Sequence, residues 1–174
     1  MVDFISLRDA SLDDLEAASR AWRDYSDRLR GCAEVYGDDV IGDVDESGWR
    51  GRAATVARNE FLPEHTRLKR AAFTAFTIYN ALSVAEKKFR GAQRELRDAM
   101  DEAHSLHIRV GDDGALIPPL LNTADRHDPE SLRAWNSTVQ RLAERMRSAR
   151  EHGDAGGPAV RRGASQAFRG ECLA

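Results

Sequence analysis

Two histidines one helical turn apart are the residues whose spacing comes closest to a chemical site. His104 and His107 follow Asp101, so all three side chains would share one face of a helix. Imidazole nitrogens and a carboxylate in that arrangement can hold zinc. Surface histidines near a helix end are the commoner outcome of such a pattern. An enzyme with a metal held by His104 and His107 is therefore kept only as a third hypothesis.

The sequence offers no other catalytic arrangement. Residues 101–104 spell the Asp-Glu-Ala-His box of helicases, but no phosphate-binding Gly-Lys-Ser/Thr loop accompanies it. No nucleophile, base and oxyanion donor converge either. Cys32 and Cys172 have neither a zinc spacing nor a disulfide framework, and Cys32 is expected to be a small core residue. We expect a protein that is not an enzyme and that carries no cofactor and no metal ion.

Composition narrows the range of partners. The 174 residues carry a formal net charge of −3, which argues against a general nucleic-acid binder. No stretch approaches the length of a transmembrane helix, and the first residues lack the basic and apolar regions of a secretory signal peptide. We therefore expect a protein that is cytoplasmic when it is synthesised, that does not insert into membranes, and that would need another route for any export.

A first long helix is predicted from Ser11, which can cap it, to the residues before Ser47. Its apolar residues recur every seven positions, which is typical of helices that pack along one face. The repeat consists of Leu15, Trp22, Leu29 and Tyr36, with Ala18, Tyr25 and Cys32 at the companion position.

A second and much longer helix carries the same seven-residue repeat. At 1.5 Å per residue it would run roughly 80–90 Å, and its phase continues through Pro63, which predicts a kink rather than a break. The repeat consists of Ala54, Phe61, Leu68, Ala75, Leu82, Phe89, Leu96 and Ala103. The companion position holds Ala57, Ala71, Ile78, Ala85, Ala92, Ala99 and Leu106.

The remaining chain predicts a connection and a third helix. Within residues 111–127, Asp113-Gly114 between short apolar runs favours a small β-hairpin. Pro129 suits the first position of a helix over residues 128–152. The apolar seam of that helix consists of Leu132, Trp135, Val139, Leu142, Met146 and Ala149. Residues 153–174 are dominated by Gly, Ala, Arg and Ser and are expected to be disordered.

Together these elements predict an all-α fold, an elongated antiparallel helical hairpin or bundle in which residues 1–110 form the hairpin. The first helix would lie antiparallel along the first half of the second, and the third helix along its second half. Two helices side by side leave each seam half covered, so a partner or a second copy is expected to complete it. The residues expected at that interface are Trp22, Leu29, Tyr36, Phe61, Leu68, Leu82, Phe89 and Leu96.

The turn between the two long helices, residues 47–51, is the most specific feature of the sequence. Gly48 permits a positive φ at the end of the first helix, and Gly51 allows close approach where the second begins. Trp49 is held between them, where it can pack across both helices or against a partner. A Trp-X-Gly tripeptide alone mostly marks an ordinary turn, and its place between two long alanine-rich helices is what makes it informative.

On these residues the chain resembles the Trp-X-Gly (WXG, ESAT-like) superfamily of helical-hairpin proteins handled by the type VII (ESX) secretion system of actinobacteria and their relatives. The resemblance covers roughly residues 10–110, with Trp49 and Gly51 as motif residues. The long second helix and residues 110–114 are closer to N-terminal modules of larger members. The resemblance implies pairing into antiparallel four-helix homo- or heterodimers, contact with a translocase component, and export without a cleaved signal peptide.

One feature of the family is missing. Its export usually requires a Tyr followed four residues later by Asp or Glu, and none of the three tyrosines here has an acid at that distance. The residues found there are Leu29, Val40 and Ser83. Either a partner supplies the signal or the chain is not itself exported. We expect a non-enzymatic interaction protein that serves type VII secretion as substrate, partner or adaptor. The alternative is a scaffold coiled-coil protein unrelated to secretion.

Overall fold

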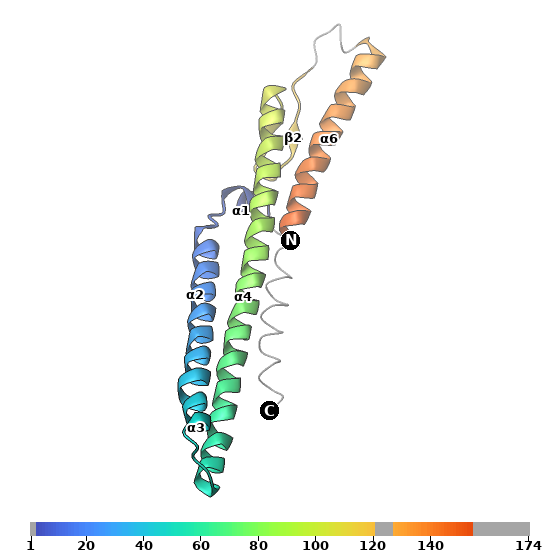
Figure 1. Cartoon of the computed structure of the whole chain (residues 1–174). Helices are drawn as coiled ribbons and strands as arrows, with labels where there is room; N and C mark the ends of the chain where they lie inside the picture. The colour runs from blue at the N-terminus through green and yellow to red at the C-terminus, as the bar shows by residue number, and fades with distance from the viewer. Residues whose placement is uncertain (1–2, 121–126, 155–174) are drawn as a thin grey trace. The chain divides into compact units, whose positions relative to one another are not determined.

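The computed structural model describes residues 3–120 and 127–154 and confirms an all-α protein with a small β element (Figure 1). Its elements are α1 (Phe4–Asp9), α2 (Asp13–Val35), a π-helix (Tyr36–Gly42), α3 (Asp43–Glu46), α4 (Arg52–Ser105), β1 (Arg109–Val110), β2 (Leu116–Ile117) and α6 (Pro129–Asp154). Two compact units divide these residues. The hairpin unit comprises residues 14–83, and the α6 unit comprises residues 3–13, 84–120 and 127–154.

The first predicted helix is confirmed as a helical path from Asp13 to Glu46, but it is not one regular α-helix. The Asp13 N–H donates to Ser11 Oγ at 3.3 Å, so Ser11 caps α2 as expected. After Val35 the path widens into a π-helix of seven residues before α3 resumes the α-helical form. π-helical turns insert extra residues and are rare, and no seven-residue repeat signals them.

The long helix α4 has 54 residues and runs through Pro63. The absence of a break at Pro63 is thus confirmed, and the predicted kink there stays a prediction. It ends in a Schellman arrangement, because the Ile108 N–H donates to the Ala103 carbonyl at 2.9 Å and the His107 N–H to the His104 carbonyl at 2.9 Å. His107 takes the left-handed conformation that glycine usually supplies there, with φ of 58°. The buried Ile108 side chain then packs with Ala103 and Leu142.

In the hairpin unit, α2 and the first half of α4 run antiparallel, as expected. Three contacts fix their direction. Asp45, near the tip, pairs with Arg58 Nε at 2.7 Å. Farther along, the rings of Tyr36 and Phe61 meet edge to face, with centroids 6.3 Å apart. Farther still from the tip, the Ser26 hydroxyl donates a hydrogen bond to the Ala72 carbonyl.

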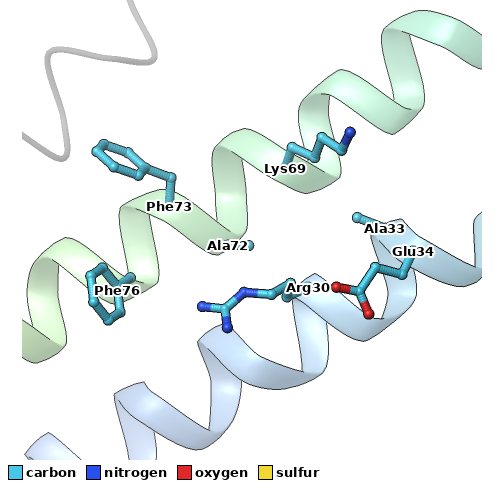
Figure 2. A pocket seen from close by; sticks show the side chains of 7 residues that line it. All are labelled: Arg30, Ala33, Glu34, Lys69, Ala72, Phe73 and Phe76. Carbon is cyan, nitrogen blue, oxygen red and sulfur yellow. The ribbon is translucent and has the colours of Figure 1, made fainter. Parts of the chain in front are cut away.

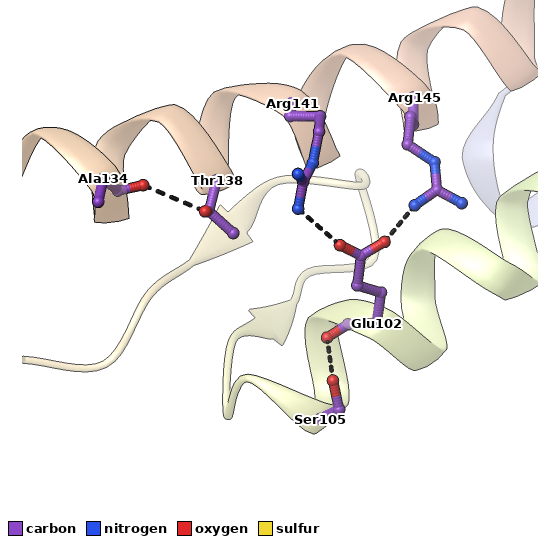
Figure 3. A network of polar contacts seen from close by, with 6 residues as sticks. All are labelled: Glu102, Ser105, Ala134, Thr138, Arg141 and Arg145. Atoms are coloured by element: carbon purple, nitrogen blue, oxygen red, sulfur yellow. Dashed lines mark hydrogen bonds and ion pairs between the residues drawn. The ribbon is translucent and has the colours of Figure 1, made fainter.

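In the α6 unit, α6 runs antiparallel to the second half of α4, which was also predicted. Glu102 accepts hydrogen bonds from both Arg141, at 2.9 Å, and Arg145 (Figure 3). The core between the helices contains side chains of α1, α4 and α6, namely Phe4, Leu7, Ala92, Leu96, Ala99, Met146 and Ala149. No helix was predicted at residues 4–9, so the contribution of α1 to this core was not expected.

The short β-hairpin is confirmed. β1 and β2 pair antiparallel, with Val110 opposite Leu116, and Gly114 in the turn has φ of 83°. α6 begins at Pro129 as predicted and ends at Asp154, a little beyond the expected end at residue 152. The expected disorder after α6 concerns residues 155–174, which lie outside the described part of the chain.

Asp128 provides a pH-dependent test of the start of α6. Its carboxylate accepts from the Ser131 hydroxyl at 2.6 Å and from the N–H groups of Glu130 and Ser131 at 3.1 Å each, which lowers its pKa below the usual 3.8. A lowered folded-state pKa means that the stabilisation is fully present above pH 3.8 and is lost as the pH falls through the folded-state value. We expect Asp128→Ala to lower the melting temperature by more at pH 7 than at pH 2.5, measured by circular dichroism, because the ionised carboxylate that caps α6 is progressively lost below pH 3.8. An equal decrease at both pH values would contradict this capping role.

Candidate interaction surface

The tip of the hairpin unit has the backbone that its glycines predicted. Gly48 and Gly51 both have positive φ, 69° and 94°. Between them, the Trp49 N–H donates to Ser47 Oγ at 3.2 Å, and the same hydroxyl donates to the Val44 carbonyl at 3.0 Å. The backbone at Trp49 is thus held by the end of α3, while Trp49 itself is 44% exposed. An exposed tryptophan on a fixed turn is a suitable recognition residue.

Along α2 the two long helices meet through small side chains, whereas the contact between the large repeat residues Tyr36 and Phe61 lies beyond the end of α2, where the π-helix begins. Ser26 has no exposed surface, and its hydroxyl donates to the Ala72 carbonyl at 3.0 Å. A side-chain hydroxyl can reach a backbone carbonyl of a neighbouring helix only where the helices approach closely. The buried residues along this contact are Ser19, Ser26 and Ala33 on α2 and Ala72 and Ala75 on α4, and Ala54 is buried nearer the tip.

The predicted interface residues of the hairpin unit lie beside this contact. All six are half-buried. They are Trp22 and Leu29 on α2, Tyr36 at the start of the π-helix, and Phe61, Leu68 and Leu82 on α4. The companion residue Tyr25 is 48% exposed. Cys32, expected in the core, is exposed, because its position on α2 lies about 100° around the helix axis from the buried Ala33. The other two predicted residues, Phe89 and Leu96, belong to the α6 unit and pack in its core.

Helix geometry shows that these half-buried residues share one side of the two-helix layer. Trp22 precedes the buried Ser26 by four residues, which rotates it about 40° around α2. Leu82 follows the buried Ala75 by seven residues and is rotated about 20° from it in the same sense. Leu68 lies between the angular positions of Ala72 and Ala75, at the edge of this side. In an antiparallel pair, rotations in the same sense bring residues to the same side. We call this side the seam face, defined by Trp22, Tyr25, Leu29, Cys32, Tyr36, Leu68 and Leu82.

The opposite side carries a groove of about 250 Å³ that the sequence analysis did not predict (Figure 2). Ala33 and Ala72 lie between its walls, and Phe73, 72% exposed, and Phe76, 40% exposed, line it on α4. The remaining lining residues are Arg30, Glu34 and Lys69. Phe73 and Phe76 lie outside both seven-residue repeats. The signal that could have found them is the absence of any charged residue from 71 to 85.

The histidines considered for metal binding lie at the end of α4 in the α6 unit. His104 and His107 border an open depression together with Asp101, and all three side chains are exposed. Over residues 3–120 and 127–154, no group of three or more His, Cys, Asp or Glu side chains is placed to hold a metal ion. His107 instead has a structural explanation, since it forms the left-handed end of α4.

Comparison of the chain with protein-family models, with curated proteins and with solved structures gives no match. In the described residues, no helix is both long enough and apolar enough to cross a membrane. The case for a function therefore depends on the surfaces of the hairpin unit.

Ser26 tests whether close approach of the helices positions these surfaces. Ser26→Ala removes one buried hydrogen bond and should lower the free energy of unfolding by about 0.5–1.5 kcal/mol. Ser26→Leu adds volume between α2 and α4 and should cost about 1–3 kcal/mol or more. Both changes in the free energy of unfolding are measured by urea unfolding monitored by circular dichroism. Asp27→Ala is the control, because Asp27 is exposed on α2. A Leu variant as stable as the parent would show that the helices are not closely packed there.

Proposed function

We propose that the hairpin unit is a protein-binding module that docks a second helical hairpin, and that it acts as a substrate, partner or adaptor in type VII secretion. Its activity is binding and involves no catalysis, cofactor or metal. The partner is either a second copy of the chain or a related hairpin protein, and the complex forms in the cytoplasm after synthesis.

The observation that carries this proposal is the incomplete burial of the seam face. Trp22, Leu29 and Leu68 recur with the spacing of a buried coiled-coil seam, yet the α2–α4 contact covers them only in part. Apolar residues at such spacing pack into the side chains of a further helix. Because α2 and α4 already meet through Ser26, Ala33 and Ala72, the further helix must come from outside the hairpin unit.

The tip supports the assignment to the WXG type. Trp49 stands between two positive-φ glycines at the junction of the hairpin helices, with its backbone fixed and its ring available. A rigid aromatic residue loses little conformational entropy on binding, which makes it an effective contact for a partner or a translocase component. The alternative, a scaffold coiled coil unrelated to secretion, uses the same seam face but gives Trp49 no role beyond closing the turn.

Tyr25→Asp tests the seam face. The residue is 48% exposed, so the variant should keep its helical circular dichroism and its stability within about 0.5 kcal/mol. A carboxylate in the centre of an apolar interface should weaken self-association, or association with a small WXG-type hairpin protein, about tenfold or more in Kd. The measurement is molar mass by light scattering over a concentration series.

Ala17→Asp is the matched control for that test, because Ala17 is exposed on α2 away from the seam face. It should associate as the parent does. If the parent chain neither self-associates nor binds the small WXG-type hairpin protein, the seam face is not a docking surface. The same conclusion follows if the Tyr25→Asp and Ala17→Asp variants behave alike.

Trp49→Ala separates the two functional readings. We expect unchanged helicity and a melting temperature within a few degrees of the parent, since the side chain is largely outside the core. Binding to the cytoplasmic domain of a type VII translocase ATPase, measured by calorimetry, should be lost or reduced about tenfold. Collapse of the helical signal would make the tip purely structural, and unchanged ATPase binding would favour the scaffold reading.

A further inference from the structure

The α6 unit contains a second recognition feature, a groove between α4 and α6 that is filled by α1. The groove is lined with the buried side chains of Ala92, Leu96, Ala99, Met146 and Ala149. The small alanine side chains of α4 leave room for α1 along one wall of the groove. α1 packs there with Phe4 and Leu7, each only 2% exposed. A short helix that inserts apolar residues three positions apart into a groove is a common mode of peptide recognition.

Two glycines shape the groove around these anchor residues. A Cβ atom on Gly114, in the β-hairpin turn, would lie 2.8 Å from Phe4 Cδ2. A Cβ atom on Gly153, near the end of α6, would lie 3.2 Å from Leu7 Cδ1. Any larger residue at these positions would press on the anchors, so the groove fits a Phe followed three residues later by a Leu.

Gln93 adds a polar contact to the apolar ones. Its side chain is 6% exposed, and Nε2 donates to the carbonyls of Leu7, at 2.9 Å, and Ala10, at 2.8 Å. Carbonyls at a helix C-terminus lack partners within the helix. Gln93 therefore binds backbone carbonyls at the end of a short helix, and this contact does not depend on the side chains of that helix.

The acidic residues at the two ends of α1, its N-cap Asp3 and its last residue Asp9, interact with arginines of α6 and α4. The pKa of Asp3 is lowered mainly by hydrogen bonds from Ser6 and further by Arg150 on α6. The pKa of Asp9 is lowered mainly by Arg8 and further by Arg97 on α4. These exposed contacts contribute little energy, but they favour one orientation of the bound helix.

The short length of α1 suits a bound ligand. Six residues are too few for a stable helix in water, so the helical form depends on the groove. Residues 10–12, between α1 and α2, are not helical, and α1 is joined to the chain there by a short tether. A tethered ligand has an effective concentration in the millimolar range, which a competitor must overcome.

We propose that the α4–α6 groove is a binding site for a short amphipathic helix of a partner protein, with Phe and Leu three positions apart, and that α1 is its intramolecular competitor. The partner is a different protein, because a second copy presents the same α1 and gains nothing over the tethered one. The groove is independent of the seam face, so this proposal does not depend on the function proposed above.

The test converts α1 into a separate molecule without changing its contacts. A site-specific protease sequence is inserted between Leu12 and Asp13 of the full chain, which is then cleaved. We expect the cleaved protein to keep its helical circular dichroism and to bind a fluorescent peptide of residues 1–12, seen as a rise in anisotropy. The uncleaved chain should bind that peptide at least tenfold more weakly, because its own α1 occupies the groove.

Matched peptides show whether binding uses the groove. Changing both Phe4 and Leu7 to Ala in the peptide should abolish binding, whereas Ile5→Ala should not, since Ile5 is 44% exposed. Gly153→Val in the cleaved chain should weaken binding at least tenfold. These results together would support the proposal.

Other outcomes would overturn it. If the cleaved chain unfolds, or if α1 stays bound and never exchanges with the labelled peptide, α1 is a permanent part of the core. If the two peptides bind alike, the site is not the groove. If the uncleaved chain forms dimers that exchange α1 between copies, the occupant is a second copy and not a different protein.

Discussion

The close contact between α2 and the first half of α4 determines what the hairpin unit can bind. Ser26 donates its hydroxyl to a backbone carbonyl of α4, and alanines lie on either side of that bond. Small side chains allow this approach, and the buried hydroxyl needs it, because a polar group away from water costs free energy unless it is paired. A larger residue at Ser26 or Ala72 would separate the helices, and at Ala72 it would also move the Ser26 hydroxyl away from its acceptor.

Close approach also moves the large side chains out of the contact. A Trp or Phe cannot lie between two helices whose backbones are within reach of a serine hydroxyl, so Trp22 and Leu82 lie on one side of the layer and Phe73 on the other. The hairpin thus has a thin core and two apolar sides. Among the described residues of the unit nothing covers Phe73, which is 72% exposed. The close approach of α2 and α4 therefore both stabilises the hairpin and leaves its large apolar side chains available to a partner.

The sequence predicted those features of the fold that follow from local rules. The repeat through Leu68 and Leu82 predicted one long helix, Asp113-Gly114 predicted the β-hairpin, and Pro129 marked the start of α6. The positive φ at Gly48 was likewise predictable. α1 was not, because six residues show no helical period and their structure depends on residues more than eighty positions away, such as Gln93.

The candidate surface was predictable only in part, for a reason that concerns hydrophobic periodicity itself. A seven-residue repeat identifies which residues avoid water, but it does not say whether the chain's own helix or another protein covers them. Serine is counted as polar, so the repeat of Ser19, Ser26 and Ala33 was overlooked although it forms the actual contact. The same ambiguity applies to the α4–α6 groove, where Phe4 and Leu7 supply from within the chain what a partner helix could supply from outside. Burial in a structure of one chain identifies the current occupant of a surface, whereas exchange between occupants depends on how tightly each one is held.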